Sequence, residues 1–321
     1  MNVFEYLGLP ASHRPSGKVV QLVKNFEEVP EKKIKYPLTA QVKKDGVYGL
    51  LVVTQNQAKV FGRTGKALSN CDGFIDPCTL EDGVYIGEVC LPGKSLEALS
   101  GIVNPNRTKA LEPELSEYWF TQREFWFHDY LSIPEFVAGK SSRPYADRLR
   151  DTILSGLPTV RTCTVNSPAS AESFAQLCIE SGEEGAVFKQ EAGWVAGHKG
   201  WHAMKRVRSI EYDLLCVGVE EGTGKYAGKV ANLIFQWRDG DTLKAMLGKG
   251  WTHLDAEKMW EDREQEWDSG LELPFNRIGC KGMNNPIGHI FTVYGLQDSS
   301  KGKVRLPKVG EIRHDKDTPD F

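Results

Sequence analysis

The stretch Val42-Lys43-Lys44-Asp45-Gly46-Val47-Tyr48-Gly49 decides how this sequence is interpreted. Lys43 leads into an Asp-Gly turn and the apolar run 50–53 follows, which predicts a lysine at the end of a strand. An amine placed there could attack a buried phosphate, but an ordinary lysine has a pKa of about 10.4 and must first lose its proton. A dry pocket, a second lysine and Mg²⁺ would each disfavour the ammonium form. The rest of the chain should therefore supply metal ligands and more positive charge.

Length and composition predict a globular protein of two domains. The chain has 321 residues, 40% of them hydrophobic and 26% charged, which argues against disorder and fibres. No apolar run approaches the roughly twenty residues of a membrane span, and the N-terminus shows no cleavable signal pattern. We therefore expect a cytoplasmic monomer without membrane contact.

The net charge and the cysteines restrict which kinds of binding site and cross-link the chain is expected to have. A net charge of −3 means that any contact with nucleic acid must come from a local basic patch. Taken singly, each cluster of basic residues is more simply explained as a solvated face. The clusters are Lys32, Lys33 and Lys35; Arg143, Arg148 and Arg150; Lys225 and Lys229. The seven cysteines are scattered and never spaced Cys-x-x-Cys, so we expect reduced packing residues rather than disulfides or structural zinc.

Several short stretches carry polar groups in places that suit a phosphate or a metal. Arg63 and Lys66 flank a glycine-containing turn, where backbone can come close to a ligand. Glu88 is the one carboxylate in an apolar strand, so it lies either at an edge in water or facing a cation. Glu184 begins an alternating strand, and Lys205 shares a face of its strand with Ala203. In the aromatic strand 124–131, core packing competes with stacking on a base for Phe127.

The remaining pattern predicts the secondary structure around these stretches. Helices are expected at 19–29, 142–156 and 167–182, the last capped by Ser167. Short strands at 214–219, 230–237, 242–247 and 289–294, with one helix at 255–267, are typical of a small OB-type barrel.

Taken in order, these stretches resemble the motifs of the covalent nucleotidyltransferases, the superfamily of ATP-dependent DNA ligases, RNA ligases and capping enzymes. Lys-x-Asp-Gly at Lys43 resembles motif I, and the segment that ends in Arg313-His314-Asp315-Lys316 resembles motif VI. Between them, motifs Ia, III, IIIa, IV and V are matched at Arg63, Glu88, Phe127, Glu184 and Lys205. The resemblance covers about residues 40–316 and is closest to the compact DNA ligases of bacteriophages.

The resemblance implies a fold, a reaction and roles for the matched residues. The fold is α+β: an adenylation domain of antiparallel sheets with helices at 1–208, then an all-β OB domain at 209–321, with a hinge near Arg208 to Tyr212. The reaction uses ATP and Mg²⁺ to seal nicked double-stranded DNA through lysyl-AMP at Lys43. Nucleotide contacts are implied for Gln41, Val42, Arg63, Glu88, Phe127, Lys205, Arg313 and Lys316. Metal contacts are implied for Glu88 and Glu184, and DNA contacts for Arg63, Lys66, Lys225 and Lys229.

The sequence departs from the family pattern at three positions, which leaves alternatives open. Tyr48 stands where most DNA ligases have arginine, and Gln41 where glutamate is common beside the adenine. Ala203 replaces the first lysine of motif V, and Lys199 is a candidate substitute. The alternatives are an RNA ligase, a GTP-using capping-type enzyme and an inactive OB-type protein that only binds nucleic acid. The short lead before Lys43 argues against the use of NAD⁺.

Overall fold

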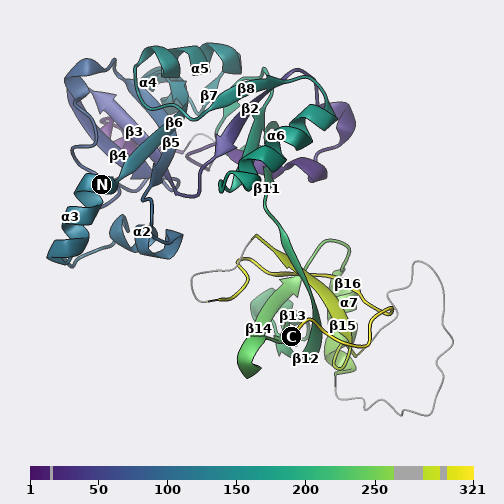
Figure 1. The fold of residues 1–321 in the computed structure, drawn as a ribbon. Helices are drawn as coiled ribbons and strands as arrows, with labels where there is room; N and C mark the ends of the chain where they lie inside the picture. The colour runs from purple at the N-terminus through teal and green to yellow at the C-terminus, as the bar shows by residue number, and fades with distance from the viewer. Residues whose placement is uncertain (15–16, 264–284, 297–301) are drawn as a thin grey trace, which may run out of the picture. The chain divides into compact units, whose positions relative to one another are not determined.

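The computed structural model describes residues 1–14, 17–263, 285–296 and 302–321. It divides into two compact units, Met1–Val207 and Arg208–Phe321, coloured purple to teal and green to yellow in Figure 1. Each unit has its own hydrophobic core.

The first unit contains a five-stranded sheet, and one of its strands, β2, ends at Lys43. Its strands, in spatial order, are β1 Leu22–Asn25, β11 Lys199–Val207, β9 Gly185–Lys189, β2 Leu38–Lys43 and β8 Thr162–Val165. All neighbours are antiparallel except β1 and β11. Helix α6, Pro168–Glu180, packs across this sheet beside β2, β8 and β11 (Figure 1). Its apolar side buries Ala171, Ala175 and Cys178.

A four-stranded antiparallel sheet completes the first unit. Its order is β4 Gln57–Gly62, β3 Val47–Thr54, β5 Gly83–Cys90 and β6 Glu124–Leu131. Strand β3 follows the Asp-Gly turn, so the turn joins the two sheets. Lys43 is the last residue of β2, just before this turn. Side chains from both faces of this sheet are buried in two separate clusters, which explains the nearly continuous apolar run 50–53.

The other elements of the first unit are short. The helices are α1 Val3–Tyr6, α2 Leu96–Ile102, α3 Pro113–Gln122, α4 Ile133–Val137 and α5 Tyr145–Leu154. Strands β7 Lys140–Ser141 and β10 Trp194–Val195 pair with each other. The 3-10 turns are η1 Phe26–Glu28, η2 Glu31–Lys33 and η3 Pro77–Thr79.

The second unit is a closed barrel with the order β12-β13-β14-β16-β15. The strands are β12 Ile210–Glu221, β13 Val230–Gln236, β14 Thr242–Leu247, β15 Ile290–Gly295 and β16 Lys308–Ile312. Helix α7, His253–Glu261, packs against β13, and η4 Gly224–Tyr226 and η5 Arg238–Gly240 lie in the connections. The predicted strands and the expected barrel are present, and β16 is a strand that the sequence pattern did not predict.

Some predicted elements are wrong or differ in detail. The helix expected at 19–29 is instead β1 followed by η1, because Leu22 and its neighbours pair with β11. Helix α5 lies within 142–156, but its buried face is Tyr145, Arg148 and Thr152, while Ile153 is exposed. The predicted helix 255–267 is described only as far as Arg263, so its end and Trp267 lie outside the described residues.

The described residues bear on two features of the composition, the apolar segments and the cysteines. No helix in the described part of the chain is long and apolar enough to cross a membrane. Cys71, Cys78, Cys90, Cys163, Cys178 and Cys216 are free thiols, as predicted, while Cys280 lies outside the described residues.

Candidate active site

Lys43 lies at the end of β2 with Glu184 beside it. In the ladder Lys43 is opposite Gly185, and the Glu184 N–H donates to the Lys43 carbonyl at 3.2 Å. The Lys43 ammonium forms an ion pair with the Glu184 carboxylate, and these side chains are 20% and 13% exposed. The pair is therefore partly open to solvent and accessible to a ligand.

Glu88 approaches this pair from β5. The Asp-Gly turn packs against β5 so closely that a Cβ on Gly46 would lie 2.4 Å from the Val89 carbonyl oxygen, which explains the glycine. Burial, together with the negative charge of Glu184, raises the pKa of Glu88 to about 7 despite the opposing charge of Lys43. Glu88 thus faces cations. Of the two positions that the sequence allowed, at a strand edge in water or facing a cation, the structure has the second.

Lys205 joins the cluster from β11. Lys205 is opposite Val187 of β9, and β9 in turn pairs with β2, the strand that carries Lys43. Burial and the positive charge of Lys43 lower the pKa of Lys205, and the charges of Arg63 and Lys199 act in the same direction. Four side chains that are distant in the sequence, Lys43, Glu88, Glu184 and Lys205, are therefore near enough for their charges to act on one another.

Arg63 borders the same cluster from the turn after β4. Its guanidinium lies over the ring of Tyr48 at 5.5 Å, and its charge acts on Glu88 and Lys205. Tyr48 is opposite Glu88 in the β3–β5 ladder. A cation-π contact therefore stands where the family pattern has a second arginine. Lys66 lies on the same turn and is exposed.

The base-stacking role predicted for Phe127 is wrong for this structure. Phe127 has no exposed surface and stacks against Phe125 in the core, with ring centroids 4.2 Å apart. A bulge between Ile86 and Gly87 on the β5–β6 ladder leaves His128 unpaired. His128 is the residue of this strand whose ring lies 6.2 Å from that of Tyr48. The pattern of the strand does not predict this position, because a bulge shifts the alternation of side chains by one residue.

Gln41 and Val42 are placed on β2 just before Lys43. Gln41 is 1% exposed and donates from Nε2 to the His128 carbonyl at 3.5 Å. Within the described part of the chain, Gln41 Oε1 is buried without a hydrogen-bond partner. An unmade bond of this kind costs free energy, which makes the atom a candidate acceptor for a ligand N–H. Val42 is buried, and its N–H donates to the Arg161 carbonyl at 3.0 Å.

A second charged cluster lies next to the first and was not predicted. Asp129 accepts from Arg148 Nε at 2.8 Å and from Lys189 Nζ at 3.1 Å, and all three side chains are less than 10% exposed. Lys189 Nζ also lies 3.4 Å from His128 Nδ1, so the two clusters meet at this histidine. Arg148, grouped by its sequence with exposed basic residues, is thus a buried partner of Asp129.

The carboxylates at Lys43 fit a magnesium ion that keeps most of its water. Among the described residues, no group of three or more His, Cys, Asp or Glu side chains could hold a metal. Glu88 and Glu184 are close enough for the charge of one to raise the pKa of the other, a repulsion that a divalent cation would relieve. Mg²⁺ in proteins is commonly held by one or two carboxylates together with water and substrate phosphates.

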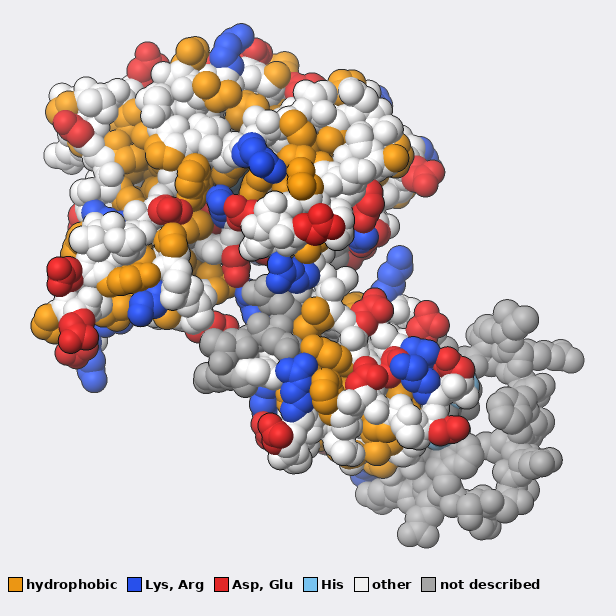
Figure 2. All heavy atoms as spheres, in the orientation of Figure 1, with side chains coloured by type: hydrophobic (Ala, Val, Ile, Leu, Met, Phe, Trp, Pro, Cys, Tyr) orange, Lys and Arg blue, Asp and Glu red, His pale blue; other side chains and the backbone are white. Residues whose placement is uncertain are grey.

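The remaining predicted residues belong to the second unit and are described within it. Arg313 and Lys316 lie beyond β16 and both pair with Asp213 of β12. Lys229 pairs with Glu257 at 2.9 Å, and Lys225 lies over the ring of Tyr226 at 4.9 Å. On the face drawn in Figure 2, basic side chains are interspersed with acidic ones, as the near-neutral composition leads one to expect.

Curated relatives of the chain are named probable DNA ligases, although no family model matches the chain. It is 36% identical over 132 residues to a probable DNA ligase of Streptomyces griseus subsp. griseus, a match that covers 37% of this chain and 25% of the relative. A probable DNA ligase of Mycobacterium sp. (strain KMS) is 31% identical over 181 residues, which cover 51% of this chain and 33% of the relative. The matches thus span a quarter to a third of these relatives.

Solved structures of DNA ligases share the fold over nearly the whole chain. A Lig E DNA ligase superposes with a TM-score of 0.64 at 15% identity and covers 92% of this chain and 98% of that chain. The ATP-dependent DNA ligase from bacteriophage T7, in complex with ATP, gives 0.50 at 16% identity, with 92% and 98% covered. This chain has the fold of DNA ligases. The predicted fold class is confirmed, and the curated matches bear out the resemblance to DNA ligases.

Proposed function

We propose that this chain is an ATP-dependent DNA ligase that seals nicks in duplex DNA through a covalent lysyl-AMP. The convergence of Lys43 with Glu88, Glu184 and Lys205 supports the proposal best. An amine, two carboxylates and a second cation are the groups that phosphoryl transfer from a magnesium nucleotide requires. The curated relatives are named DNA ligases, which favours this function over an RNA ligase or a capping-type enzyme.

In the first step the neutral Lys43 amine attacks the α-phosphorus of ATP. A nitrogen–phosphorus bond forms, the bond to pyrophosphate breaks, and the amine proton leaves. Lys205 stabilises the negative charge that develops on the α-phosphate. Glu184, which forms an ion pair with Lys43, orients the amine. Bound Mg²⁺, held by Glu88 and Glu184, would neutralise phosphate charge.

The later steps use the same pocket. The 5′-phosphate of the nick takes the adenylyl group from Lys43, and the nitrogen–phosphorus bond breaks. The 3′-hydroxyl then attacks that 5′-phosphate and releases AMP. All three displacements occur at phosphorus, so positioning and charge neutralisation account for most of the rate. We assign the ribose or phosphate side of the pocket to Arg63 and the base side to Gln41 and His128.

The second unit supplies the remaining groups in this proposal. Arg313 and Lys316 orient the triphosphate so that pyrophosphate leaves opposite Lys43, and Lys225 and Lys229 contact the DNA backbone, as Lys66 does from the first unit. The backbone near Arg208 to Tyr212 is the hinge about which the barrel moves between adenylation and sealing.

The test is covalent labelling followed by ligation. Incubation with [α-³²P]ATP and magnesium should label the wild-type protein and should not label Lys43→Ala. Lys44→Ala is the matched control, because Lys44 pairs with Glu183 and lies 5.0 Å over the Trp126 ring; it should be labelled like the wild type. The labelled protein should seal a nicked DNA duplex.

Three outcomes would each point to another function. Labelling by GTP in preference to ATP would indicate a capping-type enzyme. Sealing of RNA ends but not of nicked DNA would indicate an RNA ligase. DNA binding without any label on the wild type would indicate the inactive nucleic-acid-binding protein.

A further inference from the structure

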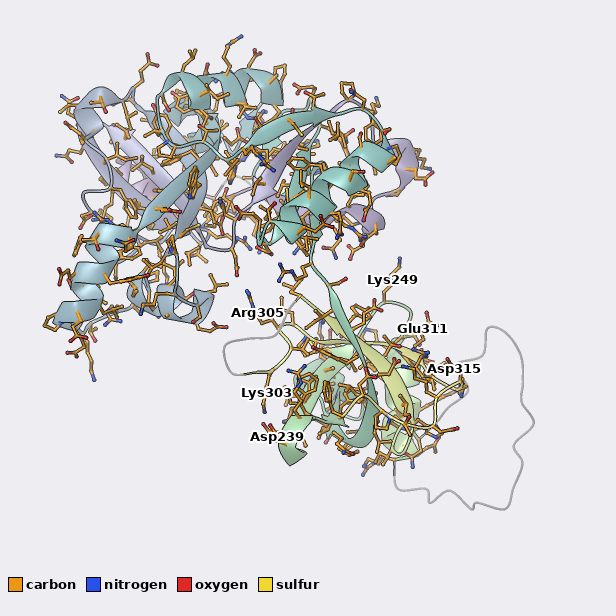
Figure 3. All side chains as sticks on the ribbon, viewed as in Figure 1. Asp239, Lys249, Lys303, Arg305, Glu311 and Asp315 are labelled. Carbon is orange, nitrogen blue, oxygen red and sulfur yellow. The ribbon has the colours of Figure 1, made fainter. Side chains whose placement is uncertain are left out.

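Asp213, on β12 of the second unit, is the centre of a charge cluster that holds both motif VI cations. Its carboxylate accepts from Arg313 Nη1 at 2.6 Å and forms an ion pair with the Lys316 ammonium. The Thr292 hydroxyl, from the neighbouring strand β15, donates to its other oxygen at 2.8 Å. Asp315, labelled in Figure 3, binds the remaining edge of the Arg313 guanidinium at 2.8 and 2.7 Å.

The segment that follows motif VI returns to the same strand. The Asp320 N–H donates to the Asp213 carbonyl at 2.8 Å, and the Asp213 N–H donates to the Asp320 carboxylate at 2.8 Å. The Phe321 ring packs against Tyr212 and Trp237, with centroids 5.3 and 5.1 Å away. Residues 313–321 are therefore docked on β12 at both ends, with Asp213 in the middle.

The cluster depends on the negative charge of Asp213. The side chain is 8% exposed, and without the two cations its carboxylate would retain, among the described residues, the hydrogen bond from the Thr292 hydroxyl. Burial alone would raise the pKa of Asp213, but the hydrogen bonds from Lys316 and Thr292 and the charge of Arg313 hold it below its ordinary value. Asp213 and the two cations therefore fix one another, because separating them would leave a nearly buried charge unpaired.

We propose that Asp213 is a positioning residue, which fixes Arg313 and Lys316 on one side of the barrel so that they meet the anionic leaving group during adenylation. This inference rests on the proposed function. Arg313 and Lys316 are otherwise long side chains with several rotatable bonds, and ordering them in advance removes that entropic cost from the reaction. Asp213 itself touches neither nucleotide nor DNA in this proposal.

The test is Asp213→Asn, which keeps the shape of the side chain and removes its charge. We expect self-adenylation by ATP to slow about tenfold to a hundredfold, mainly in kcat. Sealing of a nick that already carries the adenylyl group should stay within about twofold, because no pyrophosphate leaves in that step. Glu221→Gln is the matched control: it removes one exposed carboxylate from the far end of the same strand and should behave as the wild type in both assays.

The Arg313→Ala background tests whether Asp213 acts through the cations. Asp213→Asn should slow adenylation markedly less in that background than in the wild type, since one of its two targets is gone. An equal loss in both backgrounds, or an unchanged rate for Asp213→Asn, would overturn the inference. Failure of the proposed function looks different, because the wild type and Glu221→Gln would then take up no label at all. Thermal melting of each variant checks that the barrel remains folded.

Discussion

Two charged clusters lie side by side in the first unit, one around Lys43 and one around Asp129. They differ in how completely their charges are paired and buried. Asp129 is saturated by Arg148 and Lys189, and the three side chains are almost fully buried. The Lys43 cluster is partly exposed and contains Glu88, whose pKa is raised to about 7 by burial and by Glu184. The first arrangement is closed and stabilises the fold, whereas the second retains charge that a ligand can satisfy.

The two clusters meet at His128, and the Asp129 cluster holds this residue in place beside the Lys43 cluster. Lys189 Nζ is 3.4 Å from the His128 ring nitrogen, and Tyr145, packed under Lys189, donates to the His128 carbonyl at 2.6 Å. Burial and the charge of Lys189 lower the pKa of His128 to about 3, so its ring is neutral at physiological pH. The closed cluster therefore fixes a neutral aromatic ring at the edge of the open one.

The largest expected effect on stability comes from breaking the closed cluster. Asp129→Ala leaves Arg148 and Lys189 as buried cations and should lower the free energy of unfolding by about 3–5 kcal/mol. Urea denaturation measures this change. Asp147→Ala is the control, since its ion pair with Arg150 is exposed, and it should cost less than about 1 kcal/mol. Equal losses in the two variants would show that the Asp129 cluster is not what stabilises this region.

The open cluster should respond in the opposite way, in activity and not in stability. Lys205→Ala removes the cation assigned to the α-phosphate and should slow self-adenylation by about 10²–10³-fold. Its midpoint of urea unfolding should stay close to that of the wild type. The neighbouring Arg206, which pairs with Glu27 and Glu172, provides the control, and Arg206→Ala should adenylate at nearly the normal rate. A normal rate for Lys205→Ala would contradict the assigned role.

The smallest expected effect is the pH dependence that Glu88 gives to the open cluster. Its pKa is about 7 in the folded protein against an ordinary 4.5, so between these values the folded state binds more protons than the unfolded state. Without metal, stability should therefore fall as pH rises through this window, and Mg²⁺ should raise the melting temperature more at pH 8 than at pH 6. Melting curves of Glu88→Gln should lose both dependences; an unchanged pH profile in this variant would refute the role of Glu88.

The sequence predicted the open cluster better than the closed one. Lys43, Glu88, Glu184 and Lys205 stand in short motifs at strand positions, and simple alternation aims their side chains correctly. Asp129, Lys189 and Arg148 come from the two sheets and from helix α5, and no local pattern links them. The error at Phe127 has a similar cause, because the bulge at Ile86 and Gly87 depends on strand pairing and cannot be read from β6 alone. The barrel was predicted from its strand spacing, but β16 was missed.

The most direct test of the account is to locate the adenylyl group after reaction with ATP and magnesium. Peptide mapping by mass spectrometry should find it on Lys43 in the wild type, with Lys44 and Lys205 unmodified. Acid treatment should release AMP, as expected for a bond between phosphorus and nitrogen. An adduct on Lys44 or Lys205, or no adduct in a protein that is folded and binds ATP, would contradict the assignment of Lys43 as the nucleophile.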